Sequence, residues 1–145
     1  MKQSQPVRLQ RSLTLPNDIE TIPQLNEFID LLAEDAGLDM SLTMSLNLAI
    51  EEAVVNVMNY AYPLGTAGDV HIEATADQDW LTFVISDKGA PFDPTAKEAA
   101  DTTLSVEERP IGGLGIFLVR ELMDTIHYER TQGTNILTVR KRLQH

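Results

Sequence analysis

Hydrophobic and polar positions recur along the chain with two different periods, and each period predicts a type of secondary structure. Residues 7–15 alternate apolar and polar side chains, which predicts an early strand. Residues 22–38 repeat apolar side chains at helical spacing and contain Gly37, a residue typical of helix ends. A second helix is expected from a cap at Ser41 to about Tyr62. The first half of the chain is therefore predicted to form a strand followed by two helices.

The second half of the chain has the pattern of short strands around one helix. Strands are expected over residues 70–74, 81–87, 126–130 and 135–142, with a helix over residues 112–123. Residues 94–111 show no periodicity and contain prolines and many polar residues, which is typical of a functional loop. This order predicts an α+β fold, a two-layer sandwich in which helices cover one face of a mixed, mostly antiparallel sheet.

Composition and charge narrow the classes of protein that fit this pattern. The 145 residues are 43% hydrophobic and 23% charged, which is typical of one folded domain over residues 1–145. The net charge of −11 argues against direct contact with nucleic acid or with an anionic membrane. The chain has no cysteine, no apolar run long enough to span a bilayer and no signal-peptide pattern, so we expect a cytoplasmic protein.

The second expected helix separates its side chains onto two faces. At about 100° per residue, the apolar face carries Leu46, Ile50, Ala53, Val57 and Ala61. Glu52, Asn56 and Asn59 share the opposite face, which could be a plain solvated surface. Asparagine is a poor helix former, however, so two in a helix interior indicate a function. The amide oxygen of Asn56 suits Mg²⁺, and a carboxylate one turn away can accept a proton from a hydroxyl group.

An acidic turn follows one of the expected strands. Asp87 ends the strand, and Gly89 allows the backbone to turn or to approach a ligand closely. An ordinary Asp-x-Gly turn explains the same residues. The functional interpretation is a carboxylate that accepts a hydrogen bond from an amino group such as adenine N6. Phe92 belongs either to the core or to the wall of a base pocket.

A glycine-rich segment opens the third expected helix. Gly112, Gly113, Leu114 and Gly115 place backbone N–H groups where an anion can reach them, at the positive end of a helix dipole. A flexible hinge is the alternative interpretation. No Gly-Lys-Ser/Thr follows, so the segment is not a Walker A loop.

Taken together and in this order, these segments resemble the sequence boxes of the GHKL (Bergerat-fold) ATPase superfamily. Residues 52–56 resemble its N box, residues 87–93 its first glycine box, residues 112–115 its second, and residues 133–135 the polar start of its last strand. Within the superfamily, the chain is most similar to the anti-sigma-factor serine/threonine-protein kinases, which are domains of this size. Histidine kinases carry a phospho-accepting histidine on a helical hairpin before this domain. The only histidines here, His71, His127 and His145, all follow the N box, so we expect no such hairpin.

The resemblance implies ATP and Mg²⁺ as cofactors and gives individual residues a role. Glu52 would be the general base that activates a substrate serine, and Asn56 would bind the Mg²⁺ that bridges the ATP phosphates. Residues 94–111 would form the ATP lid. The remaining nucleotide contacts would come from Asn59 and Arg109 on phosphate, Asp87, Gly89 and Phe92 on the adenine side, Gly112, Gly113, Leu114 and Gly115 around the triphosphate, and Thr134 or Asn135 in the adenine-side polar network.

The resemblance also implies partners. The substrate would be a STAS-type anti-anti-sigma protein, the sequestered protein a sigma factor, and the kinase itself a homodimer. One alternative is an ATP-binding sequestration module without significant kinase activity that regulates a partner other than a sigma factor. Glu52 argues against this alternative, because a binding module needs no base there. A second alternative is an α+β scaffold that binds no nucleotide.

Overall fold

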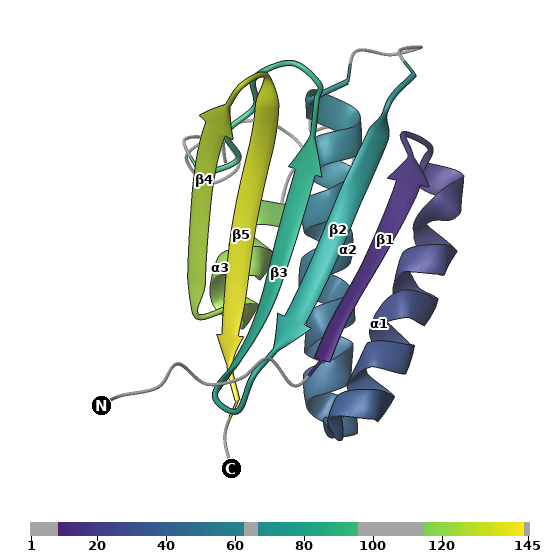
Figure 1. Ribbon diagram of the computed structural model, residues 1–145, viewed down its shortest axis with the longest axis vertical. Coiled ribbons are helices and arrows are strands. Elements are labelled where there is room, and N and C mark those ends of the chain that lie inside the picture. The colour runs from purple at the N-terminus through teal and green to yellow at the C-terminus, as the bar shows by residue number, and fades with distance from the viewer. Residues whose placement is uncertain (1–8, 63–66, 96–114, 144–145) are drawn as a thin grey trace, which may run out of the picture.

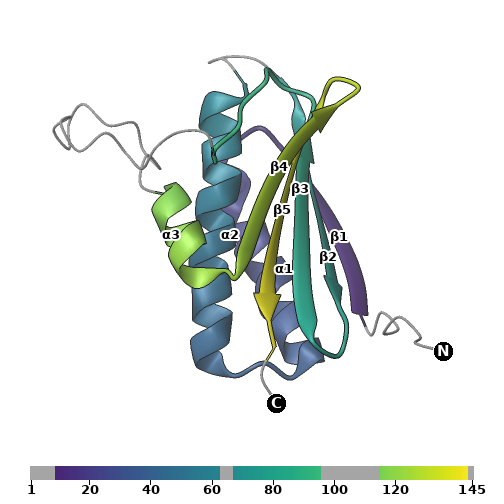
Figure 2. The same cartoon turned by 90° about the vertical axis from the view of Figure 1, so that its left-hand side faces the viewer.

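The computed structural model describes residues 9–62, 67–95 and 115–143. Within them, five strands form one sheet in the order β1-β2-β3-β5-β4, and every neighbouring pair is antiparallel. The helices lie together on one face of this sheet (Figure 1 and, from the side, Figure 2). The elements are β1 (Leu9–Pro16), a 3-10 turn (Ile19–Thr21), α1 (Ile22–Ala36), α2 (Met40–Tyr60), β2 (Asp69–Ala76), β3 (Trp80–Asp87), α3 (Gly115–Leu122), β4 (Thr125–Thr131) and β5 (Thr134–Arg142).

The α+β sandwich predicted from the sequence is confirmed, with two corrections. The described strands form a wholly antiparallel sheet and not a mixed one, because hairpins join β2 to β3 and β4 to β5. The cap of α2 is Asp39 and not Ser41. The Asp39 carboxylate accepts a hydrogen bond from the backbone N–H of Leu42 at 2.7 Å, so the helix begins at Met40.

Alternating side chains fix the register of the sheet. In β2 and β3 every second residue is buried against the helices, and Ile72 lies opposite Ile85 in the core. Asp87 continues the buried series of β3, so its carboxyl group enters the helix side of the sheet. A shift of one residue would expose this entire series, so burial holds Asp87 on the helix side.

Helix α2 is the central helix, and one stretch in its C-terminal half is buried on all sides. Residues 54–58 are all buried, in a layer where α1 and α3 both pack against α2. Asn56 belongs to this run with only 6% of its surface exposed. The two-faced pattern predicted for this helix therefore places a polar amide inside the protein, where it requires polar partners or a ligand.

The face of the sheet away from the helices carries mainly polar side chains. At one end of it, the Trp80 ring lies beneath the guanidinium groups of Arg140, 4.2 Å from the ring centroid, and Arg142, at 5.3 Å. Trp80 is the single tryptophan of the chain. None of the helices in the described ranges has the length and apolar character that crossing a membrane would require.

Candidate functional site

The C-terminal end of α2 and the turn after β3 are in direct contact. The backbone N–H of Ala90 donates a hydrogen bond to the carbonyl oxygen of Ala61 at 2.6 Å. A Cβ atom at Gly89 would lie 2.3 Å from that same oxygen, so no side chain fits there. The rings of Tyr60 and Phe92 stack with centroids 5.2 Å apart. The end of the helix that carries Glu52 thus packs directly against the turn that follows Asp87.

Asp87 is one of the most deeply buried polar residues among those described, with 4% of its surface exposed. Its Oδ1 accepts hydrogen bonds from the Gly89 backbone N–H at 2.8 Å and from Asn135 Nδ2 at 3.0 Å. Burial raises the pKa of the Asp87 carboxyl, while these two hydrogen bonds and the nearby Arg130 charge oppose the rise. The carboxyl group is therefore held rigidly at the strand end, in an orientation fixed by the protein.

Asn135 connects the acidic turn to the last two strands. Its Nδ2 group donates to Asp87 and, at 2.8 Å, to the carbonyl oxygen of Ala90. Its Oδ1 accepts from Tyr128 Oη at 2.5 Å, from Arg130 Nη1 at 2.9 Å and from the Phe92 N–H at 3.3 Å. Both amide donors are thus already used within the protein. We infer that Asn135 positions Asp87. Thr134, the other predicted residue, lies on the opposite face of the sheet and lines a cavity there.

Sequence reasoning missed the two other members of this network, Tyr128 and Arg130. Both lie on β4, in register opposite β5, and the Arg130 guanidinium also donates to the carbonyl oxygen of Gly89 at 3.1 Å. The alternation of β4 places both side chains on the same face of the strand, which is the one signal the sequence contained. Because the contacts join residues 41 and 5 positions apart, no local motif reveals them.

Glu52 and Asn56 lie one helical turn apart on α2, as predicted. Glu52 is partly buried, and burial together with the charge of Glu51 raises the pKa of its carboxyl group. A raised pKa makes the carboxylate a better proton acceptor. Glu51 itself accepts a hydrogen bond from Asn26 of α1 at 3.2 Å, so the two neighbouring carboxylates have different surroundings. Asn59, one turn after Asn56, is partly buried.

Part of the predicted site lies outside the described residues. This applies to Arg109, to Gly112, Gly113 and Leu114, and to the lid from residue 96 onward. Gly115 is the first residue of α3. Gly133 has a positive φ of 76° in the tight turn between β4 and β5, and this turn brings Thr134 beside the end of β3.

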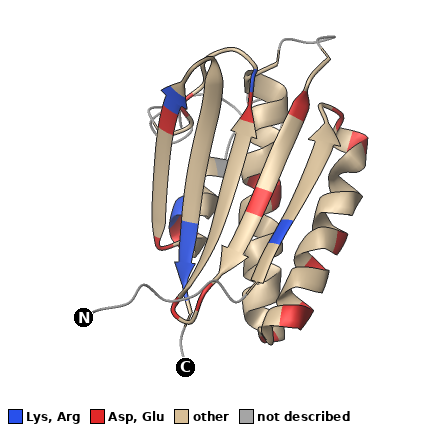
Figure 3. Ribbon diagram, in the orientation of Figure 1, with Lys and Arg blue, Asp and Glu red and all other residues tan. Residues whose placement is uncertain are grey.

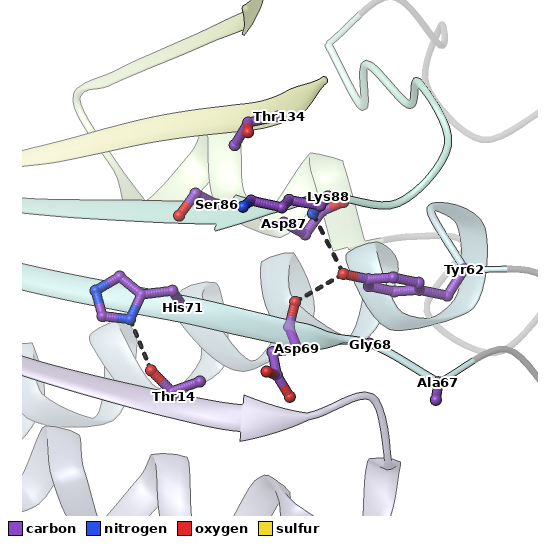
Figure 4. Close-up of a pocket in the computed structure, with 10 residues that line it drawn as sticks. All are labelled: Thr14, Tyr62, Ala67, Gly68, Asp69, His71, Ser86, Asp87, Lys88 and Thr134. Carbon is purple, nitrogen blue, oxygen red and sulfur yellow. Dashed lines mark hydrogen bonds between the residues drawn. The ribbon is translucent and has the colours of Figure 1, made fainter. Parts of the chain in front are cut away.

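A separate cavity of about 440 Å³ opens on the polar face of the sheet (Figure 4). Thr14, His71 and Ser86 are neighbours across three strands there, and Thr14 Oγ1 lies 2.8 Å from His71 Nδ1. Tyr62 closes one end, where its hydroxyl group donates to the Asp69 carbonyl oxygen at 2.7 Å. Apart from Asp87 and Thr134, its lining was not predicted. The cavity is not the predicted nucleotide site, because Asp87 makes its hydrogen bonds on the helix side.

The residues that the structure describes suit a nucleotide with Mg²⁺. A buried carboxyl group at a strand end can accept from an amino group, and the missing Cβ at Gly89 keeps the turn against the helix. Asn56 adds a buried amide oxygen, a hard donor of the type that Mg²⁺ prefers. No group of three or more His, Cys, Asp or Glu side chains gathers within the described ranges. Magnesium here would therefore be held by an amide and by phosphate oxygens.

Comparison with known proteins identifies a matching family. Residues 15–141 match the family model of the histidine kinase-like ATPase domain. The chain is 30% identical over 98 residues to the serine/threonine-protein kinase BtrW of Bordetella bronchiseptica, covering 68% of this chain and 69% of that protein. It is 28% identical over 127 residues to the serine-protein kinase RsbW of Listeria monocytogenes, covering 80% and 81%.

Among solved structures, the fold matches the RsbU and RsbW domains of Rv1364c from Mycobacterium tuberculosis. The TM-score is 0.66 at 15% identity, and the match covers 92% of this chain. The chain spans 32% of that structure. At this identity the likeness concerns the fold alone.

Proposed function

The chain belongs to the histidine kinase-like ATPase family, and on that premise we propose that it is an ATP-dependent serine/threonine-protein kinase. In this proposal it phosphorylates a STAS-type anti-anti-sigma protein and sequesters a sigma factor. The observation that carries the proposal is the contact between the end of α2 and the Gly89–Ala90 turn. This contact joins the helix that holds Glu52 and Asn56 to the turn that holds Asp87.

Each end of the proposed site performs a different task. The buried Asp87 carboxyl accepts a hydrogen bond from the adenine amino group, in an orientation fixed by Asn135 and by the Gly89 N–H. Asn56 offers its amide oxygen to Mg²⁺ beside the phosphates. ATP with Mg²⁺ supplies the phosphoryl group and neutralises its charge. Phosphoryl transfer depends mainly on such positioning and charge stabilisation.

Glu52 is the proposed general base. Its carboxylate accepts the proton of the substrate serine hydroxyl as the oxygen attacks the terminal phosphorus, and ADP leaves as the bond between that phosphorus and the bridging oxygen breaks. The raised pKa of Glu52 favours this role, because a stronger base accepts the proton more readily. A protein that only binds ATP would need no carboxylate at this position, one turn before the buried Asn56.

The partners in the proposal follow from the relatives. BtrW and RsbW are named as serine/threonine- and serine-protein kinases, which supports a protein hydroxyl as the acceptor. We propose a STAS-domain protein as the substrate, a sigma factor as the sequestered partner and a homodimer as the assembly. ATP is abundant in the cytoplasm, so we place the protein there.

A transfer assay tests the proposal. The chain is incubated with γ-labelled ATP, Mg²⁺ and a STAS-domain protein from the same organism. We expect label on a serine of that protein, and we expect Glu52→Gln to reduce the rate by about 10²- to 10⁴-fold while ADP binding is unchanged. Glu51→Gln is the matched control, because Glu51 is the adjacent carboxylate on the same helix and its contact with Asn26 needs only an oxygen acceptor. It removes the smaller of the two causes that raise the pKa of Glu52, so we expect a much smaller loss of transfer than in Glu52→Gln.

The outcomes separate the proposal from its alternatives. Nucleotide binding without transfer would identify an ATP-dependent binding module. No thermal stabilisation by ATP with Mg²⁺ would rule out both nucleotide hypotheses. Equal loss of transfer in Glu51→Gln and Glu52→Gln would show that neither carboxylate is specifically the base.

A further inference from the structure

The N-terminal half of α2 carries an exposed apolar stripe that leads to the proposed catalytic base. Met40 is 79% exposed, Met44 is 61% exposed and Leu48 is 50% exposed. They recur every four residues, and Glu52 is the next position in the same series. Successive members advance about 6 Å along the helix and stay on neighbouring parts of its surface. We call Met40, Met44 and Leu48 the α2 stripe.

The α2 stripe differs from the rest of the helix in what covers it. The C-terminal half of α2 is buried, with α3 packed against it, whereas the half that begins at Met40 extends beyond α3 (Figure 2). Six large apolar side chains are exposed among the described residues, and half of them lie in this stripe. Contiguous exposed apolar side chains of this kind mark interaction sites. Methionine is flexible and polarisable, so it adapts to the surface of a partner.

The charge around the stripe indicates which partner fits. Residues 40–60 contain no Lys or Arg, while Asp39, Glu51 and Glu52 add negative charge along the same helix. On the neighbouring α1, Asp30 accepts a hydrogen bond from Asn47, and acidic residues recur along that helix (Figure 3). An apolar centre with an acidic rim suits a partner that presents apolar side chains surrounded by Lys or Arg. A second copy of this chain would bring the same acidic rim and a net charge of −11.

We propose that the α2 stripe is the docking surface for the serine-bearing protein substrate, whose contact with Leu48 and Met44 brings its hydroxyl group to Glu52. The inference rests on the proposed kinase function. When a substrate serine reaches Glu52, the protein surface around that serine must also contact the part of α2 one turn away. Leu48 lies on that part of the helix. The stripe thus contributes to the affinity for the substrate, and Glu52 accepts the proton of its hydroxyl group.

Binding measurements with substituted variants test the inference. The probe is the STAS-domain protein used in the transfer assay, titrated by calorimetry in the presence of ADP and Mg²⁺. We expect the double variant Met44→Ser/Leu48→Ser to weaken the complex about tenfold or more. Leu31→Ser is the matched control, because Leu31 is 55% exposed on α1 and lies outside the stripe. ADP binding and circular dichroism should be unchanged in all variants, because the replaced side chains are exposed.

The outcomes distinguish failure of the docking surface from failure of the kinase proposal. Glu52→Gln should lose phosphoryl transfer but bind the probe with unchanged affinity. The stripe variant should bind the probe more weakly and need more substrate for the same rate. If the wild-type protein binds and phosphorylates the probe and the stripe variant binds it equally well, the docking surface alone is overturned. Equal weakening by Leu31→Ser overturns it too. A wild-type protein that neither binds nor phosphorylates the probe overturns both proposals. If the stripe variant converts a dimer to a monomer, the stripe is the interface with a second copy and the docking proposal is overturned.

Discussion

The nucleotide end and the transfer end of the proposed site are built in different ways. At the nucleotide end, Asp87 and Asn135 are 4% and 3% exposed. They are hydrogen-bonded to each other, and Asn135 is also bonded to Ala90 in the turn after β3 and to Tyr128 on β4. At the transfer end, Glu52 is only partly buried and follows an exposed apolar stripe. Adenine is the same in every reaction cycle, so its receptor can be prearranged. A protein substrate must enter and leave, so the surface that receives it remains open.

This comparison predicts that damage to the nucleotide end destabilises the fold, and the largest effect is expected at Asn135. Asn135→Ala would leave the buried Asp87 carboxyl, the Ala90 carbonyl and the Arg130 guanidinium without their shared partner. We expect a loss of about 3 kcal/mol in the free energy of unfolding, together with weaker ADP binding. Urea denaturation followed by circular dichroism measures the loss.

Thr138→Ala is the control for that experiment, because Thr138 lies on the same strand but on the polar face of the sheet. A stability loss at Thr138 as large as that at Asn135 would show that β5 is sensitive everywhere, and the contrast between the two ends would fail.

A smaller effect is expected from Gly89→Ala. The added Cβ would lie 2.3 Å from the Ala61 carbonyl oxygen, so the turn must move away from α2. We expect a cost of about 2 kcal/mol from this overpacking, and weaker nucleotide binding because the turn carries Asp87. Lys88→Ala, at the exposed neighbour, should change the unfolding free energy little. An unchanged melting temperature for Gly89→Ala would mean that the turn is not held by this contact.

The smallest expected effect concerns the pH dependence of stability at the transfer end. Burial in the folded protein, together with the charge of Glu51, raises the pKa of Glu52 above the ordinary value of 4.5, so the folded state holds this proton more tightly than the unfolded state. The resulting stabilisation relative to Glu52→Gln is fully present below pH 4.5 and is lost as the pH rises through the folded-state pKa. Thermal melts of both proteins across this range measure the difference. A wild-type protein that gains stability relative to Glu52→Gln as the pH rises would contradict the raised pKa.

Local periodicity was enough to predict the strands, the helices and the pairing of Glu52 with Asn56 on one helix. The cap of α2 was assigned to the wrong residue because Asp39 and Ser41 are both good capping residues, and only the backbone geometry decides between them. The family resemblance placed Thr134 or Asn135 in a polar network beside the adenine, but local patterns could not predict the hydrogen bonds that Asn135 makes. Its partner Asp87 is 48 residues away, and the strand order that brings β5 beside β3 is a property of the whole fold. The same applies to Tyr62, which follows α2. Its hydroxyl group contacts the Asp69 carbonyl oxygen at the start of β2 and the Lys88 N–H just after the end of β3.

The position of the single tryptophan has a practical consequence. Trp80 opens β3 and Asp87 closes it, so the two residues are separated by about 23 Å at the usual rise per strand residue. Cationic Arg140 and Arg142 contact the indole ring, and melting of the sheet removes both contacts. Selectively excited tryptophan emission should therefore report unfolding of the whole sheet, and it should respond little to a nucleotide bound near Asp87. One emission signal can then follow denaturation during ligand titrations.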